Sequence, residues 1–259
     1  MLERIERGWR VCATGLCFLV FGAGGLLLRL LVFPLLRLMI WERQLQILLA
    51  RAVIHWTFRA FIGLMRALGV ISYEVRGLEK LQRRGLLILA NHPTLIDIVF
   101  LMAFVRRADC IVKAGLARNP FTRGPVRAAG LVCNDGGPEL IDDCVASLRA
   151  GGNLIVFPEG TRTPRDQAPR WQRGAANVAV RGGVDVTPVR IRVSPPVLGK
   201  GERWYRVPRQ RAHFVFEVDN DIRVGDFLDE TADNKALAAR RLTDELAQIF
   251  SLETARVIA

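Results

Sequence analysis

A histidine and an aspartate stand five residues apart, at His92 and Asp97, and together they could move a proton. The apolar run 86–90 before them has the length of a buried strand, and Pro93 and Thr94 are typical of a turn that starts a helix. On one regular helix the two side chains would point about 140° apart, so they meet only if His92 lies in the turn and Asp97 in the first helical turn. Asp97 would then accept the Nδ1 proton of His92 and leave Nε2 free as a general base.

The surroundings of His92 indicate which proton would move. No serine or cysteine nucleophile stands beside it, so we expect His92 to activate a hydroxyl group of a substrate. A position at the carboxyl end of a strand is where open α/β sheets bind their ligands. The spacing alone is equally compatible with a turn histidine followed by a helix-capping aspartate.

A second polar stretch, 157–163, also follows an apolar run of strand length. Gly160 would let a ligand approach the backbone closely, and Arg162 offers a planar fork suited to phosphate or carboxylate. Glu159 could accept a hydrogen bond from a substrate hydroxyl. Two strand ends with such residues predict one shared site, although an ordinary turn with a Glu159–Arg162 ion pair is the alternative.

Strands alternate with helices from residue 70 onward, which predicts an α/β fold with a mostly parallel central sheet flanked by helices. Residues 119–124 are expected to form a loop, and Pro188 suggests that its strand is an edge strand or carries a bulge. The predicted strands are 71–75, 86–90, 110–112, 131–133, 153–157, 186–193 and 214–218, and the predicted helices are 95–104, 139–150, 174–181 and 237–250.

Charge and hydropathy together favour a membrane partner. The chain carries a formal net charge of +12 in 259 residues, and 51% of its residues are hydrophobic. The pI is about 10.6 and the mean hydropathy is +0.21. A basic, apolar chain without zinc-finger spacing or an RNA-binding motif is expected to bind an anionic membrane surface and no nucleic acid.

The cysteine and histidine pattern predicts neither disulfides nor a metal site. The five cysteines form no CxxC pair, and the chain has three histidines in all. We expect the cysteines to be small apolar fillers in a reducing compartment, with no bound metal or cofactor.

Residues 1–69 are predicted to form an N-terminal helical region that associates with the membrane, and residues 70–259 the α/β domain. The apolar run 11–28 is about long enough for a membrane span, and no cleavage site follows it. Because arginines flank this run on both sides, we favour a helical hairpin that turns at 22–25, or a helix in one leaflet, with a single span as the alternative.

The segment 41–70 is amphipathic and is expected to lie against the membrane, the alternative being an ordinary core helix. Trp9, Trp41 and Trp56 are candidate interfacial anchors. His55, in this segment, is expected to be packed or interfacial and not catalytic.

The stretches 91–97 and 157–162 together resemble the first and third sequence blocks of the glycerolipid acyltransferase family, the 1-acylglycerol-3-phosphate acyltransferases. The first block of that family is a histidine and an aspartate separated by four residues, and the third reads Phe-Pro-Glu-Gly-Thr-Arg. Residues 173–175 and 186–189 resemble later blocks. The resemblance covers roughly residues 70–220.

The resemblance implies a role for each residue of the two blocks. His92 would deprotonate the acceptor hydroxyl while Asp97 holds its ring, and no covalent acyl-enzyme would form. Glu159, Gly160 and Thr161 would bind the acceptor, whereas Arg162 and Lys113 would hold a phosphate. Pro188 would shape the pocket for the acyl chain.

The resemblance also implies the partners. The donor would be acyl-CoA or acyl carrier protein, and the acceptor a lysophospholipid, above all 1-acylglycerol-3-phosphate. The enzyme would act on the cytoplasmic face of a bacterial-type inner membrane. A non-catalytic lipid-binding protein is the alternative from another functional class.

The sequence departs from the family pattern in three places. The family has an arginine after the strand that follows Gly130, and this chain has none at 131–136. Gly115 replaces a common acidic residue, and Thr94 replaces a frequent serine. The acceptor could therefore be another lipid, such as a lyso-aminolipid, or a nearby arginine (Arg118, Arg123 or Arg127) could take over the phosphate.

Overall fold

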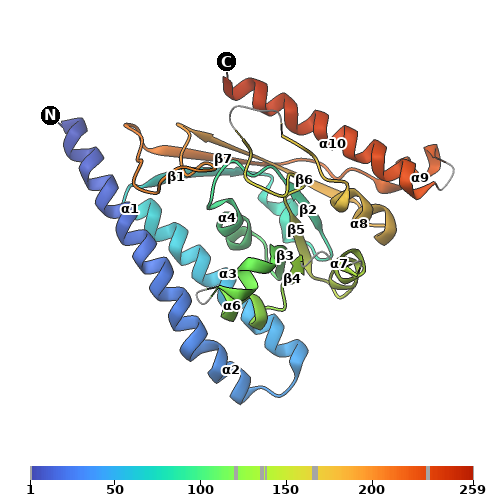
Figure 1. Cartoon of the computed structure of the whole chain (residues 1–259), viewed down its shortest axis with the longest axis horizontal. Helices are drawn as coiled ribbons and strands as arrows, with labels where there is room; N and C mark the ends of the chain where they lie inside the picture. Colours follow the sequence, from blue (N-terminus) through green and yellow to red (C-terminus); the bar gives the residue numbers. More distant parts are fainter. Residues whose placement is uncertain are drawn as a thin grey trace.

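The structure is a computed structural model that describes residues 2–119, 122–134, 137, 139–164, 169–231 and 234–258. Within these residues the chain folds around a seven-stranded sheet of order β1-β7-β6-β2-β5-β3-β4 (Figure 1). All neighbouring strands are parallel except β6 and β7, which confirms the predicted α/β fold. The strands are β1 (Ile71–Arg76), β2 (Leu87–Ala90), β3 (Ala108–Lys113), β4 (Val132–Asn134), β5 (Asn153–Val156), β6 (Val186–Ser194) and β7 (Ala212–Val218).

Helices cover both faces of the sheet (Figure 1). One face packs against α1 (Leu2–Leu27), the π-helical turn η1 (Leu28–Val32), α2 (Phe33–Met39), α3 (Arg43–Ala67), α4 (Asp97–Phe104) and α6 (Arg123–Ala128). The other face packs against α7 (Leu140–Arg149), α8 (Gly174–Gly182), α9 (Val224–Glu230) and α10 (Lys235–Ile258). Two short elements, the 3-10 turn η2 (Leu78–Gln82) and α5 (Ala114–Arg118), complete the fold.

Strand β2 shows how the sequence pattern produces two cores. Its four residues are fully buried, with Ile88 and Ala90 in the core beneath α4 and Leu87 and Leu89 in the core beneath α8. Successive side chains of a strand point to opposite faces, so a short unbroken apolar run is what a strand buried on both faces requires.

The predicted elements after residue 70 are present, and all but α10 end within two residues of the expected bounds. Residues 119–124 differ from the expectation, because α6 begins at Arg123 and includes Gly124. Pro120, in the same predicted loop, lies outside the described residues.

The prediction for Pro188 is wrong, because β6 is an interior strand between β2 and β7. The carbonyl of Pro188 accepts a hydrogen bond from the Asp219 N–H, just beyond the end of β7. Within a strand the N and C=O of one residue point to the same neighbour. The nitrogen of Pro188 therefore points toward the end of the β6–β7 ladder. Because proline has no N–H, the ladder lacks one hydrogen bond at that end.

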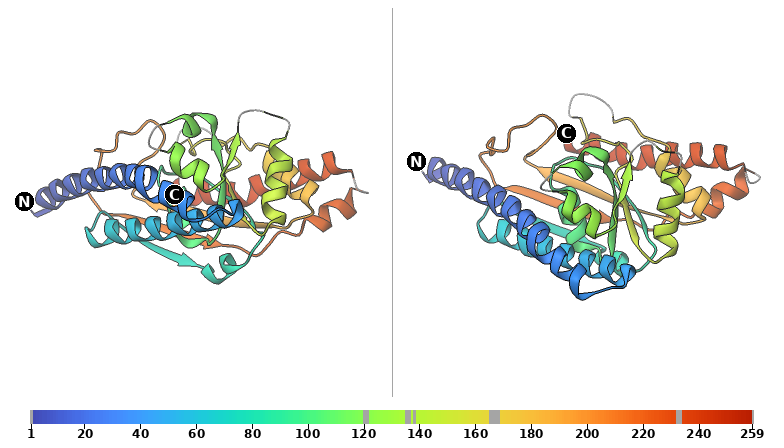
Figure 2. Two further views of the ribbon diagram at one scale, coloured as in Figure 1. Left: turned by 90° about the horizontal axis from the view of Figure 1, so that it is seen from below. Right: turned by 60° about the horizontal axis from the view of Figure 1, so that its bottom comes forward.

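The N-terminal hairpin turns at a different place from the one predicted. Gly22, Ala23, Gly24 and Gly25 lie inside α1, and the chain reverses at 40–42, between α2 and α3 (Figure 2). Pro34 accounts for the irregularity before the turn, since it cannot donate a bond to the carbonyl of Leu30. The helix widens there into η1, where the Phe33 N–H bonds to the carbonyl of Leu28.

Two helical segments, Ile5–Met39 and Arg43–Ala67, are long and apolar enough to cross a membrane by length and composition. Helix α3 also packs closely on α4. His55 is packed as predicted, with Nδ1 3.0 Å from the carbonyl oxygen of Met102 and 7% of the residue exposed. Trp9, Trp41 and Trp56 are exposed, as interfacial anchors would be.

A buried ion pair attaches α3 to the sheet. Arg51 Nη2 lies 2.6 Å from Asp109 Oδ2, and its Nε donates to the carbonyl of Ala129 at 2.9 Å. Ser147 also donates to Asp109 Oδ2, at 2.6 Å. The backbone N–H groups of Cys110 and Val132 donate to Oδ1. A single carboxylate thus joins α3, β3, β4 and α7.

Three of the cysteines are the buried fillers that we expected, namely Cys17, Cys110 and Cys144, and all five are free thiols. Burial raises the pKa of Cys110, and it raises the pKa of Cys144 to about 12. These two thiols therefore stay protonated and unreactive. Cys12 differs from the prediction, because it is exposed.

Candidate active site

The two polar stretches meet because β2 and β5 are parallel neighbours. Leu89 is in register with Val156, so His92 and Glu159 emerge at adjoining strand ends. The His92 N–H donates to Glu159 Oε1 at 3.1 Å, and the Thr163 N–H donates to the carbonyl of His92 at 2.7 Å. The predicted meeting of the two stretches is confirmed.

His92 and Asp97 are in contact, with 2.9 Å between Nδ1 and Asp97 Oδ2. His92 lies in the turn after β2 and Asp97 is the first residue of α4, which is the arrangement that the spacing required. Asp97 is fully buried and also accepts hydrogen bonds from the Thr94 N–H (2.6 Å) and hydroxyl (2.5 Å). Thr94 does in this chain what a serine would do.

The protonation of the pair follows from these contacts. Burial raises the pKa of the Asp97 carboxyl, and the hydrogen bonds from His92 and Thr94 oppose that rise. When the Asp97 carboxylate is ionised it can only accept, and in that state His92 Nδ1 carries the proton of their hydrogen bond.

Phe157 fixes the plane of the histidine ring. The two rings are stacked, with centroids 4.1 Å apart and an angle of 18° between their planes. The His92 side chain is 17% exposed, whereas Asp97 is completely enclosed. The ring is thus held on one face and at Nδ1, which suits a base that must meet its substrate in one orientation.

Glu159 is buried beside His92 and only one of its oxygens has a partner among the described residues. Oε1 accepts from the Thr163 hydroxyl at 2.7 Å as well as from His92, while Oε2 is buried without a hydrogen bond. Burial raises the pKa of Glu159. Sequence analysis missed Thr163, although a hydroxyl four residues after a strand-end glutamate was the available signal.

The turn after Glu159 contains Gly160 and Arg162. Gly160 has φ of +64°, a left-handed conformation that side chains disfavour, and Thr161 beside it is half-buried. Arg162 Nη1 donates to the carbonyls of Leu198 (3.0 Å) and Gly199 (2.7 Å). The alternative of a Glu159–Arg162 ion pair is therefore not what these two side chains form in the described structure.

The remaining predicted site residues lie in different places. Lys113 ends β3, which pairs with β5, so its exposed side chain stands at the same edge of the sheet as His92. Pro188 is buried inside β6, in register with Leu89 and below that edge. Asn134 ends β4, where the family pattern has its arginine nearby, and Asp135 and Gly136 lie outside the described residues. Arg118, Arg123 and Arg127 are exposed on α5 and α6.

A second missed residue is Asn91, which connects the site to β6. Its side chain donates to the carbonyl of Ile191 at 2.8 Å and accepts from the Ile191 N–H at 2.7 Å. An amide that forms both bonds mimics one more strand residue, so β2 stays attached to β6 up to His92. Asparagine just before the histidine was the visible signal.

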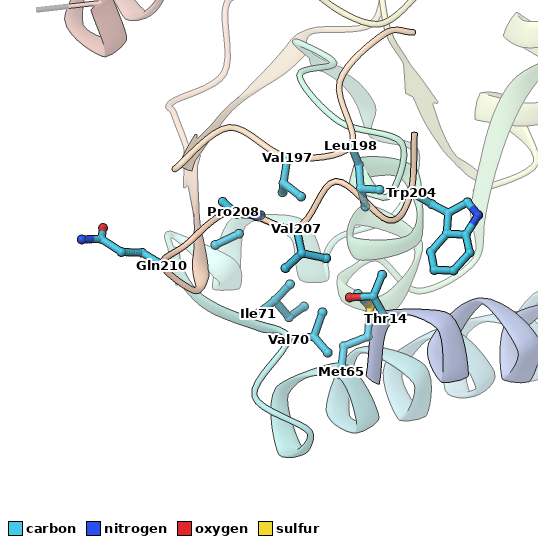
Figure 3. A pocket seen from close by; sticks show the side chains of 11 residues that line it. Thr14, Met65, Val70, Ile71, Val197, Leu198, Trp204, Val207, Pro208 and Gln210 are labelled. Carbon is cyan, nitrogen blue, oxygen red and sulfur yellow. The ribbon is translucent and has the colours of Figure 1, made fainter. Parts of the chain in front are cut away.

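The connection between β6 and β7, residues 195–211, links the site to α1, and we call it the strap. At one end Leu198 binds Arg162, and its carbonyl also accepts from the Leu95 N–H at 3.1 Å. Farther along, Trp204 packs on Phe18 of α1 with ring centroids 5.7 Å apart, and Arg7 donates to the carbonyl of Val207. A cavity of about 20 Å³ lies between the strap, α1 and the end of α3. Figure 3 shows the side chains that line it.

Among the described residues, no group of three or more His, Cys, Asp or Glu side chains is placed to hold a metal ion. The candidate site thus consists of an oriented imidazole, a buried carboxylate behind it, a half-satisfied carboxylate beside it and cationic side chains at the rim.

Known proteins are similar to this chain in sequence. The sequence model of a family described as "Acyltransferase" matches residues 72–192. A 1-acyl-sn-glycerol-3-phosphate acyltransferase of Pseudomonas aeruginosa is 31% identical over 148 residues, which are 54% of this chain and 56% of that protein. A lyso-ornithine lipid O-acyltransferase of the same organism is 30% identical over 132 residues, which are 49% of this chain and 51% of the relative. The chain spans about half the length of these curated relatives in the matched region.

A solved structure shares the fold. The 1-acyl-sn-glycerophosphate (LPA) acyltransferase PlsC from Thermotoga maritima superimposes with a TM-score of 0.63 at 20% identity, over 94% of this chain and 97% of that one.

Proposed function

The chain belongs to the glycerolipid acyltransferase family, and from that premise we propose that it transfers an acyl group from a thioester to a hydroxyl of a lysophospholipid. The observation that carries the proposal is the His92–Asp97 pair, 2.9 Å apart, at the strand edge shared with Glu159. Basic composition and two long apolar helical segments support an enzyme that acts on lipid substrates at a membrane.

The proposed reaction is a direct transfer with His92 as general base. Nε2 takes the proton of the acceptor hydroxyl while its oxygen attacks the thioester carbonyl. The new C–O ester bond forms, the C–S bond breaks, and the imidazolium returns the proton to the departing thiolate. Asp97 stabilises the imidazolium between these two steps, so no covalent acyl-enzyme is needed.

The other predicted residues receive roles that fit their positions. Glu159 Oε2 is buried without a partner in the described structure, so it can accept from a polyol hydroxyl and orient the acceptor. Gly160 and Thr161 form the adjoining turn. Arg162 and Lys113 would bind the phosphate, with Arg162 held by the strap carbonyls. Pro188 would shape the acyl pocket from within the sheet.

Two acceptors are supported by different observations. The matched acyltransferases favour 1-acylglycerol-3-phosphate. The lyso-ornithine lipid relative, together with the missing arginine after Gly130, supports a lyso-aminolipid. The donor would be acyl-CoA or acyl carrier protein, and the basic chain suits the acidic carrier.

We further propose that the enzyme acts from the cytoplasmic face of a bacterial-type inner membrane. Arginines flank the first apolar run on both sides, and Arg37 and Arg43 lie beside the reversal at 40–42, so both basic clusters stay on one side of the membrane if the hairpin lies in a single leaflet. Basic residues on both flanks favour the cytoplasmic side.

The experiment that tests the function is an acceptor panel with both donors. Purified protein in detergent receives lysophosphatidic acid or a lyso-aminolipid with acyl-CoA or acyl carrier protein. Free thiol and the new ester are then measured by mass spectrometry. We expect thiol release that depends on one acceptor. Lipid binding without thiol release for every donor and acceptor pair would instead support the non-catalytic alternative.

A further inference from the structure

An open groove of about 1000 Å³ lies between the turn of the N-terminal hairpin and the segment α6–β4. One wall comes from η1, α2 and the start of α3, and the other from residues 124–133. None of His92, Lys113, Glu159 and Arg162 lines it. The groove is thus separate from these four residues, and of the three arginines that could take over the acceptor phosphate it shares Arg127.

The walls of the groove are held by close backbone contacts. A Cβ at Gly124 would lie 2.7 Å from Arg29 Cβ, so α6 approaches η1 more closely than any side chain there would permit. Gly130, with φ of +56°, lies against Ile47, where an added Cβ would come within 3.1 Å of Cδ1. The groove is therefore built into the fold and needs glycine at two positions in its wall.

Four arginines line this groove, and no carboxylate is found among its described lining residues. They are Arg29, Arg37, Arg43 and Arg127. Arg37, Arg43 and Arg127 are exposed, and Arg43 Nη2 donates to the carbonyl of Arg127 at 3.3 Å. Arg29 comes from η1, and π-helical turns inside longer helices occur frequently at functional sites. Planar guanidinium groups that share a wall with no lining carboxylate among the described residues suit a phosphate.

The rim of the groove is strongly apolar. Leu38 and Trp41 line it and are 76% and 95% exposed, and Met39 between them is 77% exposed. Large apolar side chains this exposed are unusual on a surface that faces only water. The groove thus has cationic side chains on its walls and apolar side chains at its rim. This arrangement is complementary to an amphiphile with an anionic headgroup and hydrocarbon chains.

We infer that this groove binds the headgroup phosphate of an anionic membrane phospholipid such as phosphatidic acid, while Leu38, Met39 and Trp41 contact its acyl chains. The site is additional to the acyl transfer proposed above and holds a lipid of the surrounding leaflet. An acidic carrier protein would also meet the arginines, but it would leave three large apolar side chains in water. The lipid is therefore the better occupant.

The test measures binding to vesicles by the full-length protein. The vesicles contain phosphatidylcholine alone or phosphatidylcholine mixed with phosphatidic acid. The variant is R37Q/R43Q, whose two arginines are exposed. The matched control is R149Q/R181Q, which removes the same charge from α7 and α8 on the other face of the sheet.

We expect R37Q/R43Q to bind the anionic vesicles about 30-fold more weakly than wild type, at about 1 kcal/mol for each basic residue. The control should bind as the wild type does. An equal loss in both variants would overturn the proposal, because it would reveal only the net charge. Wild-type binding that is the same for both vesicle types would also overturn it.

A second measurement locates the lipid and distinguishes the sources of phosphate. The fluorescence of Trp41 is obtained as the difference between the emission of wild type and that of Trp41→Phe. Vesicles with brominated acyl chains should quench this fluorescence. Glycerol phosphate or acyl carrier protein in solution should not displace the vesicles, and displacement by either would contradict a lipid headgroup site. Both experiments measure lipid binding and not turnover. A negative result in either would leave the proposed acyl transfer untouched, and absence of acyl transfer would leave the proposed lipid site untouched.

Discussion

Asp97 and Asp109 are both completely buried, yet the groups around them differ in one respect. Asp109 receives Arg51, Ser147 and two backbone N–H groups, which come from four separate elements. Asp97 receives Thr94 twice and His92, all within six residues of one turn. The partner of Asp109 is a permanent cation, whereas the partner of Asp97 is an imidazole, which has a second ring nitrogen besides the one that bonds to the aspartate.

The difference separates a structural carboxylate, Asp109, from Asp97, which is proposed to support chemistry. Arg51 is 8% exposed, and its guanidinium binds Asp109 and the carbonyl of Ala129 inside the protein. His92 uses one nitrogen for its aspartate and leaves its other edge toward the strand ends. Burial of a carboxylate alone therefore does not indicate a catalytic site, and the nature of its partner does.

The largest expected effect is on turnover, when His92 of the proposed catalytic pair is replaced. His92→Ala should lower kcat by about 10²- to 10⁴-fold, the usual contribution of a general base. Thiol release from the acyl donor measures it. His213→Ala is the matched control, since this histidine bonds to Ser72 on β1, and it should keep its activity. Undiminished kcat in His92→Ala would remove His92 from the mechanism.

Breaking the structural pair should act on stability. Arg51→Ala leaves Asp109 buried with an uncompensated charge and should lower the free energy of unfolding by about 3–5 kcal/mol. Denaturant titration followed by circular dichroism measures this. The double variant Arg51→Met with Asp109→Asn should recover part of the loss, because a neutral amide needs no compensating cation and its oxygen can still accept from the Cys110 and Val132 N–H groups. A double variant as unstable as the single one would contradict this account.

Glu159 should make stability depend on pH. Because burial raises its pKa above the ordinary value of 4.5, the folded state binds the proton more tightly than the unfolded state. The free energy of unfolding should therefore fall as pH rises through the window above 4.5, by at most about 1.4 kcal/mol per pH unit. Glu159→Gln should reduce this slope, leaving the similar contribution of Asp97. An unchanged slope between wild type and variant would rule out Glu159 as its source.

The smallest effect is expected at Thr163, whose hydroxyl donates to Glu159 Oε1. Thr163→Val keeps the shape and removes that hydrogen bond, which should cost about 1 kcal/mol of stability. The KM for the acceptor should rise while the KM for the donor stays constant, since Glu159 is proposed to orient the acceptor alone. Equal changes in both constants would argue against that role.

Local patterns in the sequence predicted the proposed catalytic pair, His92 and Asp97. They missed the structural pair, Arg51 and Asp109, for the same physical reason. His92 and Asp97 are joined by one turn, so their types and spacing contain the contact. Arg51 and Asp109 are 58 residues apart, and an arginine on an amphipathic helix looks like a surface residue. The order of strands in a sheet also depends on contacts between distant segments. The sequence around Pro188 therefore could not show that β6 lies inside the sheet, between β2 and β7. The hairpin turn was predicted at the glycines 22–25, yet these stay inside α1, because a helix that packs against the rest of the protein tolerates glycine.

The strap has a mechanical consequence. It grips α1 through Trp204 and Val207, and it holds Arg162 through the carbonyls of Leu198 and Gly199. Tilting of the first helix against the body of the protein would pull on the same few residues that aim the arginine. The N-terminal hairpin and the strand edge with Arg162 are thus mechanically connected through the strap, which also lines the small cavity next to Trp204.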